Sequence, residues 1–173
     1  MNVRRARWVV LLAFVWIVMI LLGSIVLETF MVYPNIFHDP PKSFETALAF
    51  MSVRAPNDFY PPLGFLSWVA GTLSAVLVWP EKSARYWVLA SVAMMMGEGL
   101  FSMLFFWPRN EIMFIEGPAV HSAAFLRATA REFQTMHWGR VAFNAAASAF
   151  AFTALLKLHR LMSGGPEGPP YGA

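Results

Sequence analysis

The stretch REFQTMHWGRVAFN, residues 131–144, carries ionisable and amide side chains at the start of an apolar run. If this run is helical from its first residues, then His137, Arg140 and Asn144 are spaced i, i+3 and i+7, which places them on one face. An imidazole can remove a proton from a bound molecule, and a guanidinium or an amide can stabilise the resulting anion. The spacing therefore predicts one wall of a polar pocket that opens toward the outer side of a membrane.

Two carboxylates lie inside other apolar runs, at Glu28 and Glu98. Ionisable residues within membrane-spanning segments are costly, and they usually face the bundle interior or a water-filled cavity. We expect Glu28 to meet Arg140 in depth and Glu98 to approach Asn144. Purely structural roles stay open for the same positions: a protonated Glu98 bonded to a neighbouring helix, an Arg140 side chain that extends to lipid phosphates, or an interfacial His137.

Histidines and further carboxylates on the same side raise the question of a metal site. They are His38, Asp39, His121, Glu132 and His137. The Glu-x-x-His motif of di-iron bundles is absent, so we expect no bound metal, with a mixed histidine–carboxylate site as the open alternative. The chain contains no cysteine, which excludes disulfides and thiolate metal sites. It also lacks a glycine-rich phosphate loop and the G-x-S-x-G motif.

Four apolar runs must position these side chains. Hydrophobic residues make up 58% of the 173 residues and charged residues 13%, about half the charged share of a soluble domain. A helix needs about 20 apolar residues to cross the hydrocarbon core of a bilayer. We therefore predict an all-α, membrane-spanning four-helix bundle within residues 1–160. The predicted spans are 8–32, 61–80, 86–107 and 136–158, and the Gly- and Pro-rich segment 161–173 is predicted to be a flexible tail.

The two longer loops are predicted to carry short helices that lie in the membrane interface. In residues 40–54, Ser43 can cap a helix on which Phe44, Leu48 and Met51 share one face. Residues 120–134 form a second such segment. Both segments are expected to cover the outer end of the bundle.

Basic residues flank the apolar runs unevenly. Seven Lys and Arg side chains fall at one end of the predicted bundle (4, 5, 7, 82, 85, 157 and 160) and six at the other (42, 54, 109, 127, 131 and 140). The positive-inside rule then favours a multi-pass protein of the cytoplasmic (inner) membrane with both termini in the cytoplasm. With this distribution, the net charge of +3 indicates lipid head groups rather than nucleic acid as the partner.

Three short motifs give the chain a family likeness. PPLG at residues 61–64 opens the second apolar run, PRNEIM at 108–113 follows the third, and HWGR at 137–140 opens the fourth. With these motifs the chain resembles the anthrone-oxygenase-like family of small four-helix membrane proteins. At Phe133 it departs from the Trp that family members commonly carry four residues before the histidine.

The resemblance implies an oxidoreductase that converts an anthrone to an anthraquinone with molecular oxygen and without a bound cofactor. On this basis His137 is the base, Arg140 stabilises the anion, and Asn110 orients the substrate. The further candidate binding residues are Glu28, Glu98, Arg109, His121 and Asn144. An apolar, Phe-rich pocket would suit a flat lipophilic aromatic or quinone-like molecule.

Other functions stay open beside the enzyme. The small size and aromatic-rich surface also suit a non-catalytic accessory subunit of a larger membrane complex, or a subunit that binds lipid or quinone. A homo-oligomer is a further possibility. A transporter is the third candidate, and the absence of an internal repeat makes it the weakest.

Overall fold

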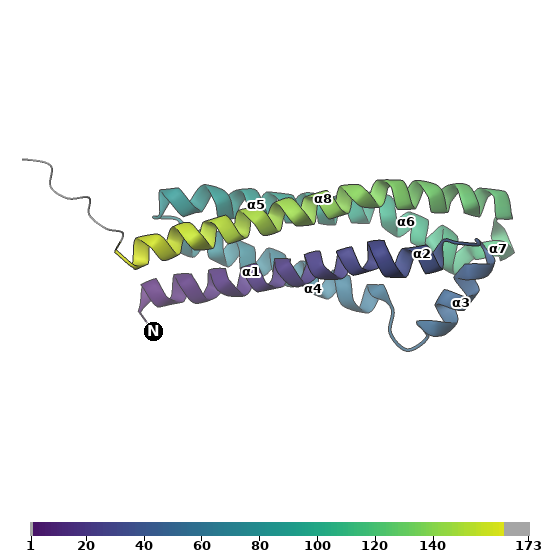
Figure 1. The fold of residues 1–173 in the computed structure, drawn as a ribbon, viewed down its shortest axis with the longest axis horizontal. Coiled ribbons are helices and arrows are strands. Elements are labelled where there is room, and N and C mark those ends of the chain that lie inside the picture. The colour runs from purple at the N-terminus through teal and green to yellow at the C-terminus, as the bar shows by residue number, and fades with distance from the viewer. Residues whose placement is uncertain (1, 165–173) are drawn as a thin grey trace, which may run out of the picture.

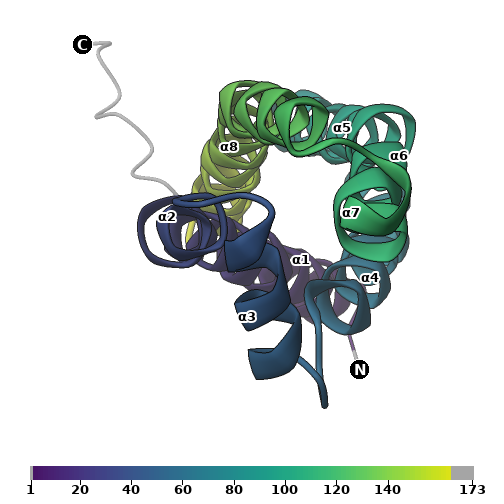
Figure 2. The same cartoon turned by 90° about the vertical axis from the view of Figure 1, so that its right-hand side faces the viewer.

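Helices form most of the described structure, with short links between them. It is a computed structural model that describes residues 2–164, and no strand occurs among them. Four helical stretches are long and apolar enough to cross a membrane: Val3–Ile36, Pro56–Val78, Lys82–Val120 and Ala123–Met162. They run side by side along the long axis (Figure 1) and form a ring when viewed from one end (Figure 2). The predicted all-α four-helix membrane bundle is thereby confirmed.

Two of these stretches, Val3–Ile36 and Lys82–Val120, are built from several consecutive elements. The elements are, in chain order, α1 (Val3–Leu27), η1 (Glu28–Val32), α2 (Tyr33–Ile36), α3 (Lys42–Phe50), α4 (Pro56–Val78), α5 (Lys82–Phe101), η2 (Ser102–Phe106), α6 (Trp107–Asn110), η3 (Glu111–Glu116), α7 (Gly117–Val120) and α8 (Ala123–Met162). The elements named η are wider, π-helical turns. We call the end that carries α2, α3 and α7 the distal end, and the end where the N-terminus lies the basic end (Figure 1).

The helices extend further than the predicted spans. The third stretch continues past the predicted end at 107 to Val120, and α8 begins at Ala123 rather than at 136. The separate interfacial helix expected over 120–134 is therefore wrong, because these residues form the first third of α8. Hydropathy marks the part of a helix that suits lipid, and the polar residues of 108–134 end that signal without ending the helix. The tail predicted at 161–173 begins inside α8, and residues 165–173 lie outside the described part.

Each π-helical turn ends two residues before a proline. Tyr33, Trp107 and Gly117 follow the three turns directly, and each donates its backbone N–H to the carbonyl five residues earlier. The next residue is Pro34, Pro108 or Pro118. A proline inside a helix has no N–H, and its ring clashes with the carbonyl four residues before it. Widening the preceding turn lets the helix pass Pro34 and Pro108 without ending, whereas Gly117, with φ 54° and ψ −150°, breaks the helical backbone before Pro118. Such turns often occur at functional sites.

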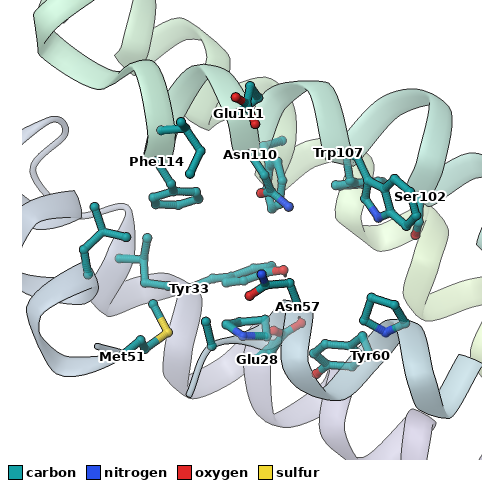
Figure 3. Close-up of a pocket in the computed structure, with 18 of the residues that line it drawn as sticks. Glu28, Tyr33, Met51, Asn57, Tyr60, Ser102, Trp107, Asn110, Glu111 and Phe114 are labelled. Atoms are coloured by element: carbon teal, nitrogen blue, oxygen red, sulfur yellow. Dashed lines mark hydrogen bonds between the residues drawn. The ribbon is translucent and has the colours of Figure 1, made fainter. Parts of the chain in front are cut away.

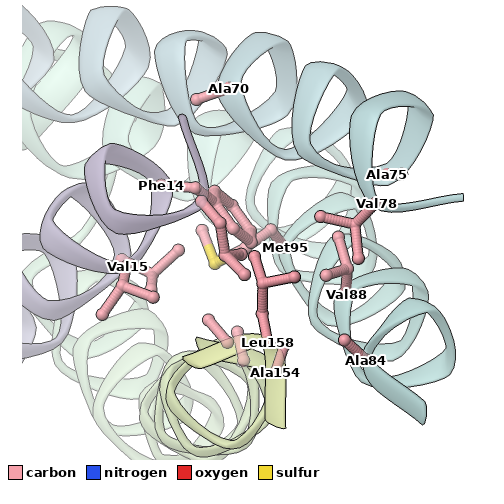
Figure 4. Close-up of a cluster of buried hydrophobic side chains, with 14 of the residues drawn as sticks. Phe14, Val15, Ala70, Ala75, Val78, Ala84, Val88, Met95, Ala154 and Leu158 are labelled. Carbon is pink, nitrogen blue, oxygen red and sulfur yellow. The ribbon is translucent and has the colours of Figure 1, made fainter. Parts of the chain in front are cut away.

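Small side chains on α8 bring the helices of the basic half close together. Ala147, Ala151 and Ala154 are buried on one face of α8, where small residues let membrane helices approach each other. They contribute to the core cluster that is shown in part in Figure 4, in which Phe14, Met95 and Leu158 converge. Two hydroxyls join the helices here: Ser91 Oγ donates to the Ala147 carbonyl at 2.7 Å, and Ser148 Oγ donates to the Val18 carbonyl at 3.2 Å.

Helix α3 lies at the distal end, beside α2 and at the edge of the ring of long helices (Figure 2). Its Phe44 is buried in an aromatic cluster with Phe37 and Phe133, and this contact holds α3 in place. Ser43 is not the cap that the sequence indicated. It lies inside the first turn of α3, and its Oγ donates to the Ile36 carbonyl at 2.6 Å, which ties α3 to α2 instead.

Candidate functional site: a polar cavity in the distal half

A cavity of about 580 Å³ lies in the distal half of the bundle. Figure 3 shows Glu28, Tyr33 and Tyr60 on one side of it, facing Asn110 and Phe114 on the other. Every long helix contributes to its wall, and Leu48 of α3 and Met51, directly after α3, line it at the distal end. Aromatic and aliphatic side chains form most of the lining, with a few polar groups among them, which is the usual character of a small-molecule site.

An ion pair between α5 and α8 places a cation in the wall of this cavity. Arg140 Nε donates to Glu98 Oε1 at 2.9 Å, and the Ser102 hydroxyl donates to the same oxygen at 2.8 Å. Both charged side chains are largely covered, with 11% and 13% of their surface exposed. The guanidinium carbon also lies 4.9 Å from the ring centre of Phe106 and 5.8 Å from that of Tyr60. Arg140 therefore does not extend to the membrane surface, and it lines the cavity as a fixed cation.

Glu28 faces the same cavity from the first helix, at the start of η1. It is 6% exposed, and the Tyr33 hydroxyl donates to its Oε2 at 3.2 Å. The π-helical turn favours this contact, because its i→i+5 hydrogen bond joins the backbones of Glu28 and Tyr33. Glu28 and Arg140 thus lie in one lining, as expected. Glu98 and Asn144 both line the smaller cavity beside it, and Glu98 takes Arg140 as its bonding partner. Asn144 donates its amide N–H to the Arg140 carbonyl at 3.0 Å.

His137 is buried on the inward face of α8, but it lines neither this cavity nor the smaller one beside it. Its Nε2 lies 2.8 Å from the Thr29 hydroxyl oxygen. That hydroxyl donates to the Ile25 carbonyl at 2.6 Å, so it can only accept from an Nε2–H. The neutral ring then carries a lone pair on Nδ1, which is buried without a partner. Its ring packs against Tyr33, with 4.5 Å between ring centres, and so the base implied by the family resemblance lies behind the cavity wall.

The other candidate residues divide between the cavity and the surface. Asn110 lines the cavity. Arg109 instead makes an exposed two-point contact with Glu132, at 3.2 and 2.9 Å, and covers the Phe105 ring. His121 bonds Glu116 at 2.5 Å beside the turn that joins α7 to α8. Neither Arg109 nor His121 lines the cavity.

The residues weighed as ligands for the alternative metal site are not brought together. Over residues 2–164, no three His, Asp or Glu side chains are close enough to hold a metal ion. His38, for example, bonds the Asn35 carbonyl at the surface, and Asp39 is exposed. The mixed histidine–carboxylate site is therefore not assembled in this part of the chain.

Two tyrosines of the site were missed by the sequence reasoning. Tyr33 and Tyr60 were assigned to loops, because the predicted spans ended at 32 and began at 61. Helix α4 instead begins at Pro56, and proline is favoured in the first turn of a helix. That proline was a usable signal: it places Asn57, Tyr60 and Gly64 at i, i+3 and i+7 on one face of α4.

Comparison with known proteins adds no relative: no family model, no curated protein and no solved structure matches the chain. The resemblance to the anthrone-oxygenase-like family thus has its three short motifs as its only support.

Proposed function

We propose that this membrane protein binds a lipophilic aromatic molecule that carries an acidic or carbonyl oxygen, of the anthrone or quinone type, in the distal cavity. One observation carries the proposal: a fixed cation, Arg140, and a carboxylate, Glu28, lie in one otherwise aromatic lining. A flat ring system would pack against the aromatic walls, and its oxygen would accept from Arg140. The hydroxyl of Tyr60, in the same lining, is a further donor.

We further propose that the bound molecule is oxidised in this cavity, as the family resemblance implies. Glu28 removes a proton from the acidic CH₂ of the anthrone, and Arg140 holds the resulting anion. The anion reduces molecular oxygen, the CH₂ carbon becomes a carbonyl, and one water molecule leaves, so one anthrone and one O₂ give one anthraquinone and one H₂O. Glu28 replaces His137 as the proposed base because the imidazole does not reach the cavity.

A second candidate function is binding without turnover, as in a quinone- or lipid-binding subunit of a larger complex. The position of His137 favours it: the base that the resemblance implies is bonded to Thr29 behind the wall. This function uses the same cavity and the same Arg140. The two candidates differ only in whether oxygen is consumed.

The experiment is oxygen uptake by the purified protein in lipid nanodiscs supplied with 1,8-dihydroxyanthrone, with quinone formation followed by absorbance. We expect Glu28→Gln to lower the rate about 10²- to 10⁴-fold, the range for loss of a general base. Removing the anion stabiliser, Arg140, should lower the rate about 10²- to 10³-fold. This second test uses the double variant Glu98→Gln/Arg140→Gln, because Arg140→Gln alone would leave the Glu98 carboxylate without its partner.

The matched control is the other Arg–Glu pair between the same two helical stretches, Arg109 and Glu132. It is exposed and lies outside the cavity, so Arg109→Gln/Glu132→Gln should leave the rate unchanged. Binding of the anthrone without oxygen uptake would select the non-catalytic function. Absence of anthrone binding, or equal losses in the two double variants, would refute the proposed site.

The proposed location is the cytoplasmic membrane, with both termini in the cytoplasm. It is supported by the seven basic residues at the basic end against six elsewhere. Because the chain has no cysteine, single cysteines report orientation directly. Ser52→Cys at the distal end should react with a membrane-impermeant maleimide in intact cells, and Ser163→Cys, at the basic end, only after lysis; the reverse pattern would invert the topology.

A further inference from the structure

A second, smaller cavity of about 230 Å³ adjoins the first. The two share five lining residues, which are Tyr60, Pro61, Ser102, Trp107 and Arg140. The shared residues include the fixed cation of the proposed site, so the two cavities meet at Arg140. The larger, wide cavity lies toward the distal end, and the smaller, narrow cavity lies nearer the basic end.

Helix α4 contributes one wall to both cavities. The α4 residues of the two linings include Asn57, Tyr60, Gly64 and Trp68, spaced i, i+3, i+7 and i+11, which form a single stripe on the helix. The polar groups of this stripe that face the wide cavity are the Asn57 amide and the Tyr60 hydroxyl, at its distal end. Opposite it, Glu98 is bonded to Arg140 and the Asn144 amide N–H to a carbonyl, while Asn144 Oδ1 is buried without a partner. The narrow cavity therefore offers an apolar wall along α4.

The narrow cavity reaches the outer surface of the bundle between α4 and η2. Helix α4 packs along α5, but it does not follow the chain into η2 and α6. Phe65 and Trp107 both line the narrow cavity, and they are also 66% and 52% exposed on the outside. Toward the basic end the gap is closed by Trp68, whose Nε1–H donates to the Met95 carbonyl of α5 at 3.1 Å. Trp68 therefore marks the end of the gap nearest the basic end.

The narrow cavity also lies at the depth of the lipid tails. Helix α4 has 23 residues and is about 35 Å long, little more than the roughly 30 Å of the hydrocarbon core. The narrow cavity lies against residues 60–68, well inside this helix, whereas the wide cavity extends past its first residue to α3. The opening between α4 and η2 therefore faces lipid tails, and the wide cavity lies at the membrane surface.

We propose that the narrow cavity is a subsite for the apolar tail of the ligand. The ligand class is then a lipophilic aromatic with an alkyl or prenyl chain. The head occupies the wide cavity at Arg140, and the chain lies along α4 and leaves between α4 and η2 into the bilayer. This inference rests on the proposed function and deepens it. A tail that stays in lipid or in this apolar subsite never has to enter water. Transfer of the chain into water would be unfavourable and would otherwise prevent such a ligand from binding.

Gly64 provides the test, because it lines the narrow cavity and no atom lies within 4 Å of where its Cβ would be. The substitution Gly64→Trp should fill the subsite without disturbing its neighbours. Gly23 on α1 is the matched control: it has the same free space, is exposed, and lines neither cavity. Equal thermal unfolding of Gly64→Trp, Gly23→Trp and the parent protein shows that all are folded.

The probes are 1,4-naphthoquinone and the same quinone with a decyl chain. Binding is measured in nanodiscs and expressed per mole fraction of probe in the lipid, with empty nanodiscs as the blank. The parent protein and Gly23→Trp should bind both probes with similar affinity. In Gly64→Trp the decyl probe should lose at least about tenfold in affinity, while the chain-free probe is unchanged.

The outcomes separate the inference from the proposed function. If the parent protein binds the chain-free probe but rejects the decyl probe, or if Gly64→Trp treats both alike, the tail subsite is refuted and the proposed function stands. If the parent protein binds neither probe, the proposed function fails, and the tail subsite fails with it. Selective loss of the decyl probe in Gly64→Trp alone supports the inference.

Discussion

Two glycines that line the narrow cavity should respond in opposite ways to the same change, Gly→Ala. A Cβ at Gly99 would overlap Cζ2 of the Trp68 ring and lie 3.3 Å from its Cε2, whereas a Cβ at Gly64 would meet nothing within 4 Å. The Trp68 ring cannot simply turn away, because its Nε1–H is bonded to the Met95 carbonyl at 3.1 Å. The contact between α4 and α5 therefore depends on the missing side chain at Gly99.

The expected free energies follow from these contacts. Replacing Gly by Ala inside a helix stabilises it by about 0.8–1 kcal/mol where space allows, so Gly64→Ala should raise the free energy of unfolding by about that amount. At Gly99 the same gain is opposed by overpacking, which costs about 1–3 kcal/mol, and by about 1 kcal/mol if the Trp68 hydrogen bond breaks. We expect Gly99→Ala to be less stable than the parent protein by roughly 1–2 kcal/mol.

The assay is unfolding in detergent micelles by increasing fractions of a denaturing detergent, followed by far-UV circular dichroism. The clash is tested by repeating Gly99→Ala in a Trp68→Phe background, which removes the overlapping ring atom. In that background the alanine should become neutral or stabilising. Equal shifts for Gly64→Ala and Gly99→Ala, or a Gly99→Ala penalty that persists in the Trp68→Phe background, would refute the reasoning.

Variants at three other polar contacts are measured by the same unfolding assay. Glu98→Gln and Arg140→Gln should each lower the free energy of unfolding by about 3–5 kcal/mol, because each leaves one buried charge without its partner. The double variant removes both charges and should lose clearly less than the sum of the two; additive losses would contradict this. Arg109→Gln, which breaks an exposed ion pair, should cost less than about 1 kcal/mol, and a larger loss would mean that this surface pair is structural. Thr29→Val leaves Nε2 of His137 without its partner and should cost about 1–3 kcal/mol, while Thr29→Ser retains the hydroxyl and should cost clearly less.

The parts of the fold that follow from local composition were accessible from the sequence. The four apolar runs predict four spanning helices, because crossing lipid requires long runs of apolar side chains. The spacing of His137, Arg140 and Asn144 places them on the face of α8 that is buried in the structure. Both features depend only on residues within one helix.

The details of the site depend on other helices and on irregular turns. His137 lies behind the wall because Thr29, more than one hundred residues earlier, takes its Nε2–H. Tyr33 reaches Glu28 only through a π-helical turn, which a search at the 3.6-residue period does not detect. Glu98 pairs with Arg140 because of how α5 packs on α8, and no local pattern specifies that registration.

The π-helical turns also bear on how such a cavity can change. Each holds one residue more than the α-helical turn it replaces, and one residue rotates every later side chain by about 100° around the helix axis. Deleting one residue from Glu28–Val32 would turn Tyr33 away from the cavity and leave α1 as it is. A deletion in Ser102–Phe106 or Glu111–Glu116 would rotate the side chains that follow it in the third helical stretch, on the opposite side of the cavity. Chains of this fold that take different ligands are therefore expected to differ by single-residue insertions and deletions at these three places, more than by substitutions in the lining.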